Sequence, residues 1–484
     1  MKLIFDHSVP GRRGVGLPEC DVPAMNRVAL PEFLRRAEPA ALPEVSELDA
    51  VRHFTLLGRQ NMGVDTHFYP LGSCTMKYNP KVNERVAELP GFTELHPQVP
   101  QLRGGNAFCQ GALEVLYETE RLISMLTGFA AITPQPMAGA NGELTSIMMF
   151  AAWHKSRGDV QRKIILIPDS AHGTNPASAA VAGFVCQEIP STAEGDVDIE
   201  KLKEALNDQI AGIMLTTPNT LGFFDQHVEE VVRLVHEAGG LAYCDGANFN
   251  AILGRIRPGD LGFDAMHMNT HKTFSTPHGG GGPGSGVVGV AERLVPFLPN
   301  PRVVKKADGT FELCHDFPQS IGYVAPFYGN FGVLLRAYTY LLMCGSKGFT
   351  RISENAVLNA NYVRARLAPY YEQKYTRSCM HECVLSATRQ AEKGVHALDV
   401  AKALLDAGFH APTIYFPLIV PEALMIEPTE TESKQTLDDF CEAMIAIAKT
   451  AEENPEQIKK CPQTTPVGRL DEVAAARQPI LTAR

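Results

Sequence analysis

Strands and helices alternate along residues 163–290, and this alternation constrains the fold more than any other feature. Short apolar runs at 163–168, 213–217 and 241–245 have the length and composition of buried parallel strands. Valines at helical spacing within 228–238 predict a helix between the last two runs. Alternating strands and helices predict a mostly parallel sheet with helices on both faces, which is the α/β class.

The flanking segments divide the chain into three expected parts. Residues 1–85 are rich in Pro, Gly and Arg and show few helix or strand signals beyond 30–36. We expect them to form an extended arm that wraps a partner or a neighbouring domain. Residues 86–350 are expected to form a large domain around the sheet, and residues 351–484 a smaller C-terminal α/β domain.

Further helices are expected outside the alternating segment. They are a helix from about residue 105, an apolar helix over 144–153, a long helix over 327–342 at the back of the sheet, and amphipathic helices over 399–407 and 436–451. An apolar run at 413–420 separates the last two helices, and the polar stretch after Pro462 is interpreted as a tail.

A single lysine lies between an apolar stretch and a glycine-rich loop. Lys272 belongs to the segment 269–275 (NTHKTFS), and the loop covers 277–286. Most lysines are solvated surface charges. The apolar lead-in at 263–268 instead favours a partly desolvated amine, which can act as a nucleophile and form an imine with an aldehyde cofactor.

A carboxylate ends the strand expected at 241–245. Burying Asp245 without a partner would be costly, so the residue has a structural or a chemical role. The structural role would be to cap the segment that follows. The chemical role would be a salt bridge to the ring nitrogen of pyridoxal phosphate, because this cofactor accepts electrons only while that nitrogen is protonated.

A histidine lies just past the end of the strand expected at 163–168. In an open α/β sheet, this position of His172 faces the crevice where ligands bind. An imidazole there can stack on a pyridine ring, although a lone histidine is more often a satisfied structural residue. The order of His172, Asp245 and Lys272 on successive strand ends favours a pyridoxal phosphate site with these three as catalytic residues.

A turn of small residues at 137–143 precedes the helix expected over 144–153. The first turn of a helix leaves N–H groups unpaired, and the helix dipole adds to their affinity for an anion. This favours a phosphate site, with an ordinary loop-to-helix turn as the alternative. Besides the three catalytic candidates, the residues expected to contact the cofactor are Ala140, Asn141, Gly142, Thr174, Ala247, Thr270 and His271.

These motifs together resemble one family, the pyridoxal-phosphate-dependent glycine decarboxylases of the glycine cleavage system, and within it the second subunit of the two-subunit form. The motifs that carry the resemblance are 67–77 (HFYPLGSCTMK), 170–178 (SAHGTNPAS), 245–248 (DGAN), the Lys272 segment with its glycine run, and 427–433 (EPTETES). The resemblance covers essentially the whole chain.

The resemblance implies an aspartate aminotransferase-like fold, known as fold type I of the pyridoxal phosphate enzymes. It implies an imine at Lys272, a pyridinium contact at Asp245 and ring stacking by His172. It further implies decarboxylation of glycine and transfer of the aminomethyl group to the lipoyl arm of the H-protein. Single-chain members carry two similar halves, whereas this chain has one set of catalytic motifs. A separate subunit 1 is therefore implied, with two copies of each subunit in a heterotetramer.

Composition favours a soluble, cytoplasmic enzyme. The net charge of −10 argues against a nucleic-acid partner. No apolar run is long enough to span a membrane, and the N-terminus lacks the pattern of a signal peptide. The 11 cysteines are scattered, and the pair Cys379 and Cys383 has no matching second pair. We therefore expect structural thiols and no metal site.

Two alternatives stay open from the residues alone. Another fold type I enzyme, either an amino-acid decarboxylase or a cysteine desulfurase, would share Lys272, Asp245 and His172, although a desulfurase needs a mobile cysteine near its site. The second alternative is a scaffold subunit without chemistry, which would have no need of Lys272.

Overall fold

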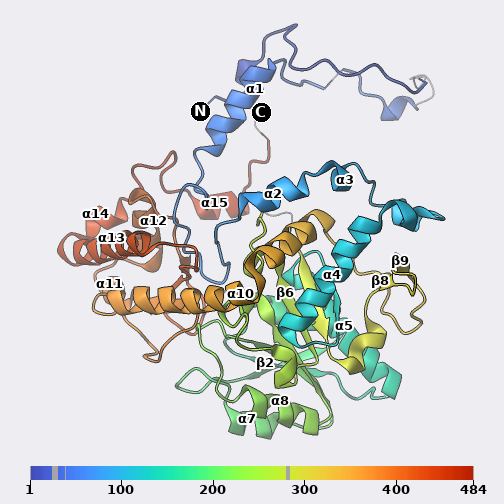
Figure 1. Cartoon of the computed structure of the whole chain (residues 1–484). Coiled ribbons are helices and arrows are strands. Elements are labelled where there is room, and N and C mark those ends of the chain that lie inside the picture. Colours follow the sequence, from blue (N-terminus) through green and yellow to red (C-terminus); the bar gives the residue numbers. More distant parts are fainter. Residues whose placement is uncertain (1, 24–30, 39, 280–283, 483–484) are drawn as a thin grey trace. The chain divides into compact units, whose positions relative to one another are not determined.

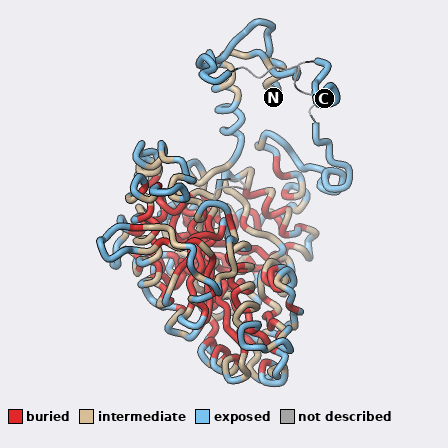
Figure 2. The backbone as a smooth tube through the Cα atoms, turned by 90° about the vertical axis from the view of Figure 1, so that its right-hand side faces the viewer, coloured by how far each residue is buried: buried red, intermediate tan, exposed pale blue. Residues whose placement is uncertain are grey.

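Two compact units make up the chain, residues 1–63 and residues 64–484 (Figure 1). The computed structural model describes residues 2–23, 31–38, 40–279 and 284–482. Buried residues gather in the second unit, whereas the first unit is mostly exposed (Figure 2). The glycine-rich loop expected near Lys272 is therefore described only in part, because residues 280–283 lie outside these ranges.

The first unit contains a helix that the sequence analysis missed. Two short 3₁₀ turns, η1 (Ile4–His7) and η3 (Glu32–Leu34), precede the α-helix α1 (Glu47–Gly58). Ser46 caps this helix by accepting the N–H of Asp49 at 3.1 Å. The prediction of few helix signals here was wrong, because the cap and the apolar spacing of Leu48 and Val51 were signals. None of the residues of α1 is buried.

The expected division at residues 85 and 350 stays a prediction, although the boundary between the two compact units falls after residue 63. Residues 64–85 belong to the second unit. Phe68 packs in a core cluster, and Lys77 is 2% exposed and ion-paired with Glu430 at 2.8 Å. An expected arm segment is therefore an integral part of the second unit, because its side chains complete cores built by residues far along the chain.

The second unit is built around a seven-stranded sheet with the order β1-β7-β6-β5-β4-β2-β3. The strands are β1 (Ala131–Thr133), β2 (Ile164–Pro168), β3 (Val185–Ile189), β4 (Ile210–Thr216), β5 (Leu241–Asp245), β6 (Ala265–Asn269) and β7 (Gly286–Val290). Strands β3, β2, β4, β5 and β6 are parallel, and β7 runs antiparallel to both β6 and β1. The predicted mostly parallel sheet is confirmed.

Helices cover both faces of this sheet. On one face lie α5 (Gly139–Arg157) and α6 (Thr174–Val181), and on the other lie α4 (Gln110–Thr127), α8 (Val228–Glu237) and α10 (Phe331–Leu367). Neighbouring residues of a strand point to opposite faces, so Tyr243 packs on the α5 side and Cys244 on the α4 side. Burial on both faces explains why the strands are continuously apolar.

Two helices differ in extent from the prediction. Helix α5 begins at Gly139 rather than at 144, because the small-residue turn is itself helical. Helix α10 starts near the expected position but continues to Leu367, with a kink at Gly345, where φ is 58° and ψ is 178°. Its later part packs in the C-terminal core through Ala360 and Val363, so one helix spans both cores.

The C-terminal region forms a smaller α/β layer. A three-stranded antiparallel sheet has the order β10-β12-β11, formed by β10 (Cys383–Ser386), β11 (Thr413–Ile414) and β12 (Ala423–Ile426). Its helices are α11 (Thr388–Ala391), α12 (Ala397–Asp406), α13 (Lys434–Glu453) and α14 (Pro455–Lys459). Cys379 and Cys383 are free thiols buried in this core, as expected of structural cysteines.

Short elements connect these layers. They are α2 (Lys81–Ala87), α3 (Pro90–Thr93), η4 (Val99–Gln101), η5 (Gly105–Phe108), α7 (Ile199–Ala205), η6 (Gly246–Ala251), η7 (Pro258–Leu261), α9 (Thr270–Thr273), η8 (Glu292–Phe297), the hairpin β8 (Arg302–Lys305) and β9 (Phe311–Cys314), and α15 (Glu472–Arg477). Within the described ranges, no helix combines the length and apolar character needed to cross a membrane.

Candidate active site

A cavity of about 160 Å³ lies at the carboxyl ends of the parallel strands. Lys272 lies in α9, immediately after β6, and Asp245 is the last residue of β5. His172 lies between β2 and α6. All three side chains line the cavity. Ligands of open α/β sheets bind at this edge, because the strand ends and the loops that follow them leave a crevice there.

The structure brings together six of the ten residues expected in the site. The residues that line the cavity are Lys272, Asp245, His172, Ala247, Thr174 and Ala140. The other four, Asn141, Gly142, Thr270 and His271, do not line it. Gly142 instead allows α5 to approach the sheet, since a Cβ there would lie 2.7 Å from the carbonyl oxygen of Gly286. Their binding role stays a prediction.

Asp245 is held at the site by neighbours on both sides. The side chain is 2% exposed. Its Oδ1 accepts the N–H of Ala247 at 3.0 Å and lies 3.6 Å from Nε2 of His267. The expected capping contact therefore exists, and the carboxylate also faces the cavity. A buried carboxylate at this position can hold a proton on a ligand's ring nitrogen.

His172 presents a neutral ring to the cavity. Its Nδ1 lies 2.9 Å from Oγ1 of Thr174 and accepts the N–H of the same residue at 3.2 Å. His172 is an exposed residue that lines the cavity, yet the protein packed around it lowers the pKa of His172, against the opposing field of Asp245. A neutral imidazole suits stacking on an aromatic ligand, because no charge has to be desolvated.

The start of α5 suits an anion. Ala138 precedes the helix and offers no side-chain cap, so the first N–H groups of this 19-residue helix have no such partner. Asn141 uses its side-chain oxygen to accept the N–H of Met137 at 3.0 Å. Gly139 and Ala140 line the cavity, so the positive end of the helix dipole faces it.

Eight further residues line the cavity, and none of them was predicted from the sequence to lie there. They are Ser73, Gly139, Glu143, Thr216, Thr220, Asn248, His267 and Asn269. Five of them lie inside motifs that were recognised: Ser73, Gly139, Glu143, Asn248 and Asn269. For the four polar or acidic ones, a side chain that can bond to a ligand within a recognised motif was the available signal. Nothing in the local sequence sets Thr216 or Thr220 apart from ordinary strand and loop residues.

A second set of titratable groups lies in the C-terminal region, and we call it the acid cluster: His381, Glu382 and Glu427. All three residues are fully buried, and their potential ligand atoms lie within 4.8 Å of one another, as in no other such group of the described chain. Glu382 accepts the N–H of Ser73 at 2.8 Å, and Glu427 accepts the N–H of Thr75 at 2.9 Å.

The electrostatics of the acid cluster favour neutral groups. Burial raises the pKa of both carboxyls, and the charge of Glu427 raises that of Glu382 further. Burial and the charge of Lys272 lower the pKa of His381 to about 3. The cluster has the ligand types to hold a cation, against the expectation of no metal, but the raised carboxyl pKa values favour protonated carboxyl groups.

Strained backbone surrounds Lys272 and the acid cluster. Ser73, Thr75, Ser275 and Thr429 have φ values of 64°, 49°, 54° and 64°, in the left-handed region that non-glycine residues rarely adopt. Ser275 donates to the carbonyl of Tyr78 at 2.5 Å, which ties the segment after Lys272 to the segment after Thr75. Such conformations persist only where the surrounding structure enforces them, and they concentrate at functional sites.

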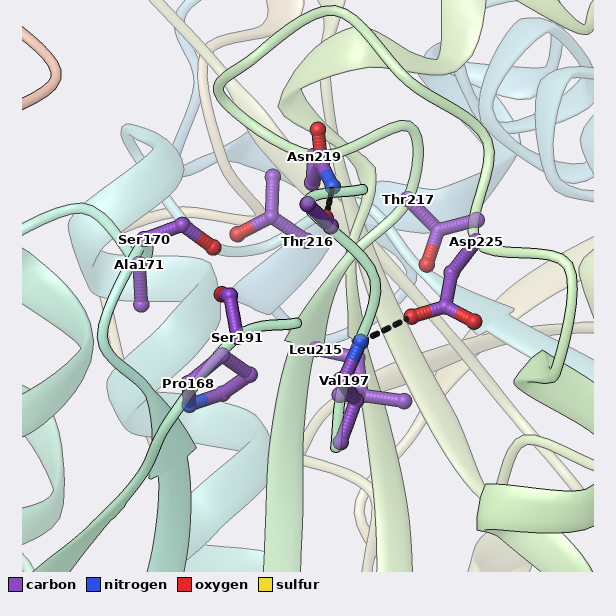
Figure 3. Close-up of a pocket in the computed structure, with 11 residues that line it drawn as sticks. Pro168, Ser170, Ala171, Ser191, Val197, Leu215, Thr216, Thr217, Asn219 and Asp225 are labelled. Atoms are coloured by element: carbon purple, nitrogen blue, oxygen red, sulfur yellow. Dashed lines mark hydrogen bonds between the residues drawn. The ribbon is translucent and has the colours of Figure 1, made fainter. Parts of the chain in front are cut away.

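A smaller pocket of about 20 Å³ lies beside the cavity and shares Thr216 with it (Figure 3). Asp225 accepts the N–H of Val197 at 2.8 Å, and the amide of Asn219 donates to the carbonyl of Gly195 at 2.9 Å. These bonds connect the loops that follow β3 and β4. Thr220 in turn donates to the carbonyl of Ser170, so the same loops support the segment that carries His172.

Comparison with known proteins identifies the family and the fold of this chain. A family model described as the C-terminal domain of glycine dehydrogenase matches residues 352–465. A curated protein of Caldanaerobacter subterraneus subsp. tengcongensis, named "Probable glycine dehydrogenase (decarboxylating) subunit 2", is 57% identical over 480 residues, which are 99% of this chain and 98% of that protein. The chain belongs to the glycine dehydrogenase (decarboxylating) subunit 2 family.

A second member of the glycine dehydrogenase subunit 2 family supports this assignment. A Bacillus licheniformis protein of the same name is 55% identical over 480 residues, with 99% of this chain and 98% of that protein covered. The resemblance to the second subunit of the two-subunit form is therefore confirmed.

Solved structures confirm the fold of this glycine dehydrogenase subunit. An inhibitor-bound glycine decarboxylase (P-protein) of the glycine cleavage system aligns with a TM-score of 0.71 at 20% identity, covering 87% of this chain and 94% of that one. A cysteine desulfurase of Thermococcus onnurineus aligns with a TM-score of 0.58 at 15% identity, covering 79% and 95%. Fold type I is thereby confirmed, and because two activities share this fold, the fold alone does not define the function.

Proposed function

We propose that this subunit decarboxylates glycine with pyridoxal phosphate held at Lys272 and passes the aminomethyl group to the lipoyl arm of the H-protein. The observation that carries the proposal is the convergence of Lys272, Asp245 and His172 on one cavity, in a chain 57% identical to a glycine dehydrogenase subunit 2. The name of that relative includes the decarboxylation of glycine, which is the activity that we propose for this chain.

The donor set of the cavity fits this cofactor. Lys272 supplies an amine for its aldehyde carbon, and Asp245 supplies a carboxylate for its ring nitrogen. His172 offers a neutral ring face, and the start of α5 at Gly139 and Ala140 offers N–H donors for its phosphate. When bound, pyridoxal phosphate supplies an electron sink for the charge left on carbon when carbon dioxide departs.

The chain's own residues control that chemistry. Asp245 keeps a proton at the ring nitrogen, because its carboxylate is buried and its orientation is fixed by Ala247. His172 and Thr174 present a wall against which a flat ring can be held. A substrate that enters this cavity of about 160 Å³ displaces water from it, and the loss of water strengthens these interactions.

A cysteine desulfurase is the less favoured alternative. That chemistry needs a thiolate near the lysine, and Cys74 follows Ser73, which lines the cavity. Burial raises the pKa of Cys74, although the charge of Lys272 opposes this shift. A raised pKa keeps the thiol protonated and weakly nucleophilic. The scaffold alternative leaves unexplained why Lys272 reaches a cavity together with Asp245.

The subunit works with partners. The family name of a second subunit implies a first one, and we propose two copies of each subunit in a cytoplasmic heterotetramer. The first unit is suited to bind a partner surface, since Leu48, Val51 and Phe54 of α1 are exposed. Apolar side chains exposed side by side mark interaction surfaces.

Glycine–bicarbonate carbon exchange tests the proposal. The purified chain should bind pyridoxal phosphate and show its absorption band, but exchange glycine carboxyl carbon poorly. Adding subunit 1 and lipoylated H-protein should raise the exchange rate by at least about a hundredfold, because the catalytic surface is then complete. Full exchange without subunit 1 would contradict the partner requirement, and sulfide release from cysteine would favour the desulfurase.

A further inference from the structure

A buried acid of the cavity has no role in the function proposed above. Glu143 lies in the second turn of α5, is 4% exposed and lines the cavity with Lys272, His172 and Asp245. An acid in such a place has to be satisfied by donors or carry a proton itself, because an unpaired buried carboxylate is costly.

Three side chains of α6 bond to this carboxyl group. Oγ1 of Thr174 lies 2.9 Å from Oε1 of Glu143, and the hydroxyl of Ser178 donates to Oε2 at 3.2 Å. The amide of Asn175 is assigned with its nitrogen toward the acids, 3.0 Å from Oε2 of Glu143 and 3.2 Å from Oδ2 of Asp245. The two N–H groups of one amide thus connect Glu143 to Asp245.

The hydroxyl of Thr174 has one proton and two neighbours that could accept it. One is Oε1 of Glu143, and the other is Nδ1 of His172 at 2.9 Å. Nδ1 already accepts the N–H of Thr174 at 3.2 Å, so it is the unprotonated nitrogen of the ring. If Glu143 were ionised, the hydroxyl of Thr174 would donate its hydrogen bond to Glu143. A lone pair of Thr174 Oγ1 would then face the lone pair of His172 Nδ1 at 2.9 Å.

A proton on Glu143 removes this conflict. Glu143 then donates to Thr174, and Thr174 donates its hydroxyl proton to Nδ1 of His172, which shares its one lone pair between the hydroxyl and the N–H of Thr174, so that no two lone pairs face each other. The remaining proton of the neutral ring is then on Nε2. The surroundings of Glu143 also favour its protonated form. Burial and then the charge of Asp245 raise the pKa of Glu143 to about 7, although the hydrogen bonds from Thr174 and Ser178 and the charge of Lys272 oppose this shift.

The titratable groups that face Glu143 come from every element around it. They are Asp245 and Tyr243 of β5, His267 of β6, Lys272 of α9 and His172 before α6. Burial lowers the pKa of His267 and of His172 and raises that of Tyr243, so these three stay neutral near pH 7. Glu143, whose pKa is raised to about 7, changes its charge near neutral pH.

We propose that Glu143 is a positioning residue, which carries a proton, donates it to Thr174 and thereby fixes His172 in the tautomer with its proton on Nε2. The inference rests on the proposed function, because it concerns how His172 is presented to pyridoxal phosphate. It adds a residue that acts through Thr174 rather than by contact with the reacting atoms.

The test is the pH dependence of pyridoxal phosphate affinity in the apoprotein, measured by fluorescence. The side-chain amide introduced by Glu143→Gln donates like a neutral acid, so the affinity of this variant should match wild type at pH 6. From pH 6 to pH 8 the affinity of wild type for pyridoxal phosphate should fall about tenfold relative to Glu143→Gln, because the fraction of Glu143 that is neutral falls over this range. Glu188→Gln, at an exposed acid of β3, is the matched control and should follow wild type.

Two further variants separate positioning from folding. Thr174→Val should lose affinity at both pH values and Thr174→Ser should restore it, while thermal unfolding of the apoprotein shows that each variant folds. Nitrogen-15 shifts of His172, assigned with a His172→Gln variant, should report a proton on Nε2 at pH 6 in wild type and in Glu143→Gln.

The outcomes distinguish this inference from the proposed function. Parallel pH profiles for wild type and Glu143→Gln, or a proton on Nδ1 of His172 at pH 6, would overturn the role of Glu143 while leaving the cofactor assignment intact. A wild-type chain that binds no pyridoxal phosphate at any pH would overturn the proposed function, and the role of Glu143 with it.

Discussion

The strand ends and the acid cluster both present titratable groups whose charges interact with Lys272, but the two regions are assembled differently. Asp245 is the last residue of β5 and Lys272 comes three residues after β6, so each is placed by its own strand. The acid cluster depends on long-range contacts instead, since Ser73 bonds to Glu382 across 309 residues and Thr75 to Glu427 across 352. Local placement makes the strand-end residues recognisable from sequence, whereas the acid cluster exists only in the folded chain.

The largest effect is expected at Lys272. Lys272→Ala should abolish covalent cofactor binding and lower decarboxylation by about 10³-fold or more, because the amine that holds the cofactor is removed. Borohydride reduction followed by mass spectrometry detects the covalent cofactor, and circular dichroism checks the fold. The control is Lys393→Ala, at an exposed lysine. Cofactor still fixed to the Lys272→Ala chain would show that the strand ends do not supply the attachment site.

A smaller effect is expected at Asp245. Asp245→Asn keeps an oxygen for the N–H of Ala247, now 3.0 Å away, but loses the charge that holds a proton on the cofactor's ring nitrogen. Cofactor binding should persist, while decarboxylation falls by about 10²-fold or more. Carbon exchange at saturating glycine is the measurement. Turnover close to that of wild type would mean that Asp245 acts as a cap and that the strand ends are less catalytic than we propose.

The smallest effect is expected in the acid cluster, and on stability. Glu427→Ala leaves the N–H and the hydroxyl of Thr75 without their acceptor and should lower the free energy of unfolding by about 1–3 kcal/mol. Glu427→Gln retains an acceptor oxygen and should cost less. Urea unfolding at constant pH measures both. Equal losses in the two variants would show that the hydrogen bonds to Thr75 contribute little.

The pH dependence of the same variants tests the charge state of the acid cluster. The pKa of Glu427 in the folded chain is raised above its ordinary value of 4.5. Its contribution to stability is therefore complete below about pH 4.5 and is lost as pH rises through the raised value. Wild type should lose stability relative to Glu427→Gln between pH 5 and pH 8. A relative gain over that range would indicate an ionised cluster, held by Lys272 or by a metal ion.

Much of the architecture followed from patterns within single segments. The strands β2, β4 and β5, the valine face of α8 and the helices α12 and α13 appear where hydrophobic periodicity predicted them. Errors arose where a local signal had two meanings. The small residues before 144 were interpreted as a turn and are the start of α5, because glycine and alanine there let the helix approach the sheet.

Glu143 in the cavity and Thr75 beside the acid cluster illustrate the limit of what the sequence predicts about the site. Both lie inside motifs that were recognised from sequence, yet neither was given a role. Both residues are buried, and a buried polar group needs hydrogen-bond partners. These two properties distinguish them from surface residues of the same type. The hydrogen-bond partners of Glu143 are Thr174, Asn175 and Ser178, which all belong to another helix, α6.

The sequence by itself determined the α/β class, the family and the position of His172, Asp245 and Lys272 at strand ends, because each depends on patterns that lie within single segments of the chain. Only the tertiary structure decided that residues 64–85 belong to the second unit and that Glu143 is connected to both His172 and Asp245. It also decided that three buried titratable groups form an acid cluster on which the charge of Lys272 acts. The physical reason is that exclusion of water and charge–charge proximity arise from packing between distant segments, and these set the protonation of a carboxyl group more strongly than its neighbours in sequence do.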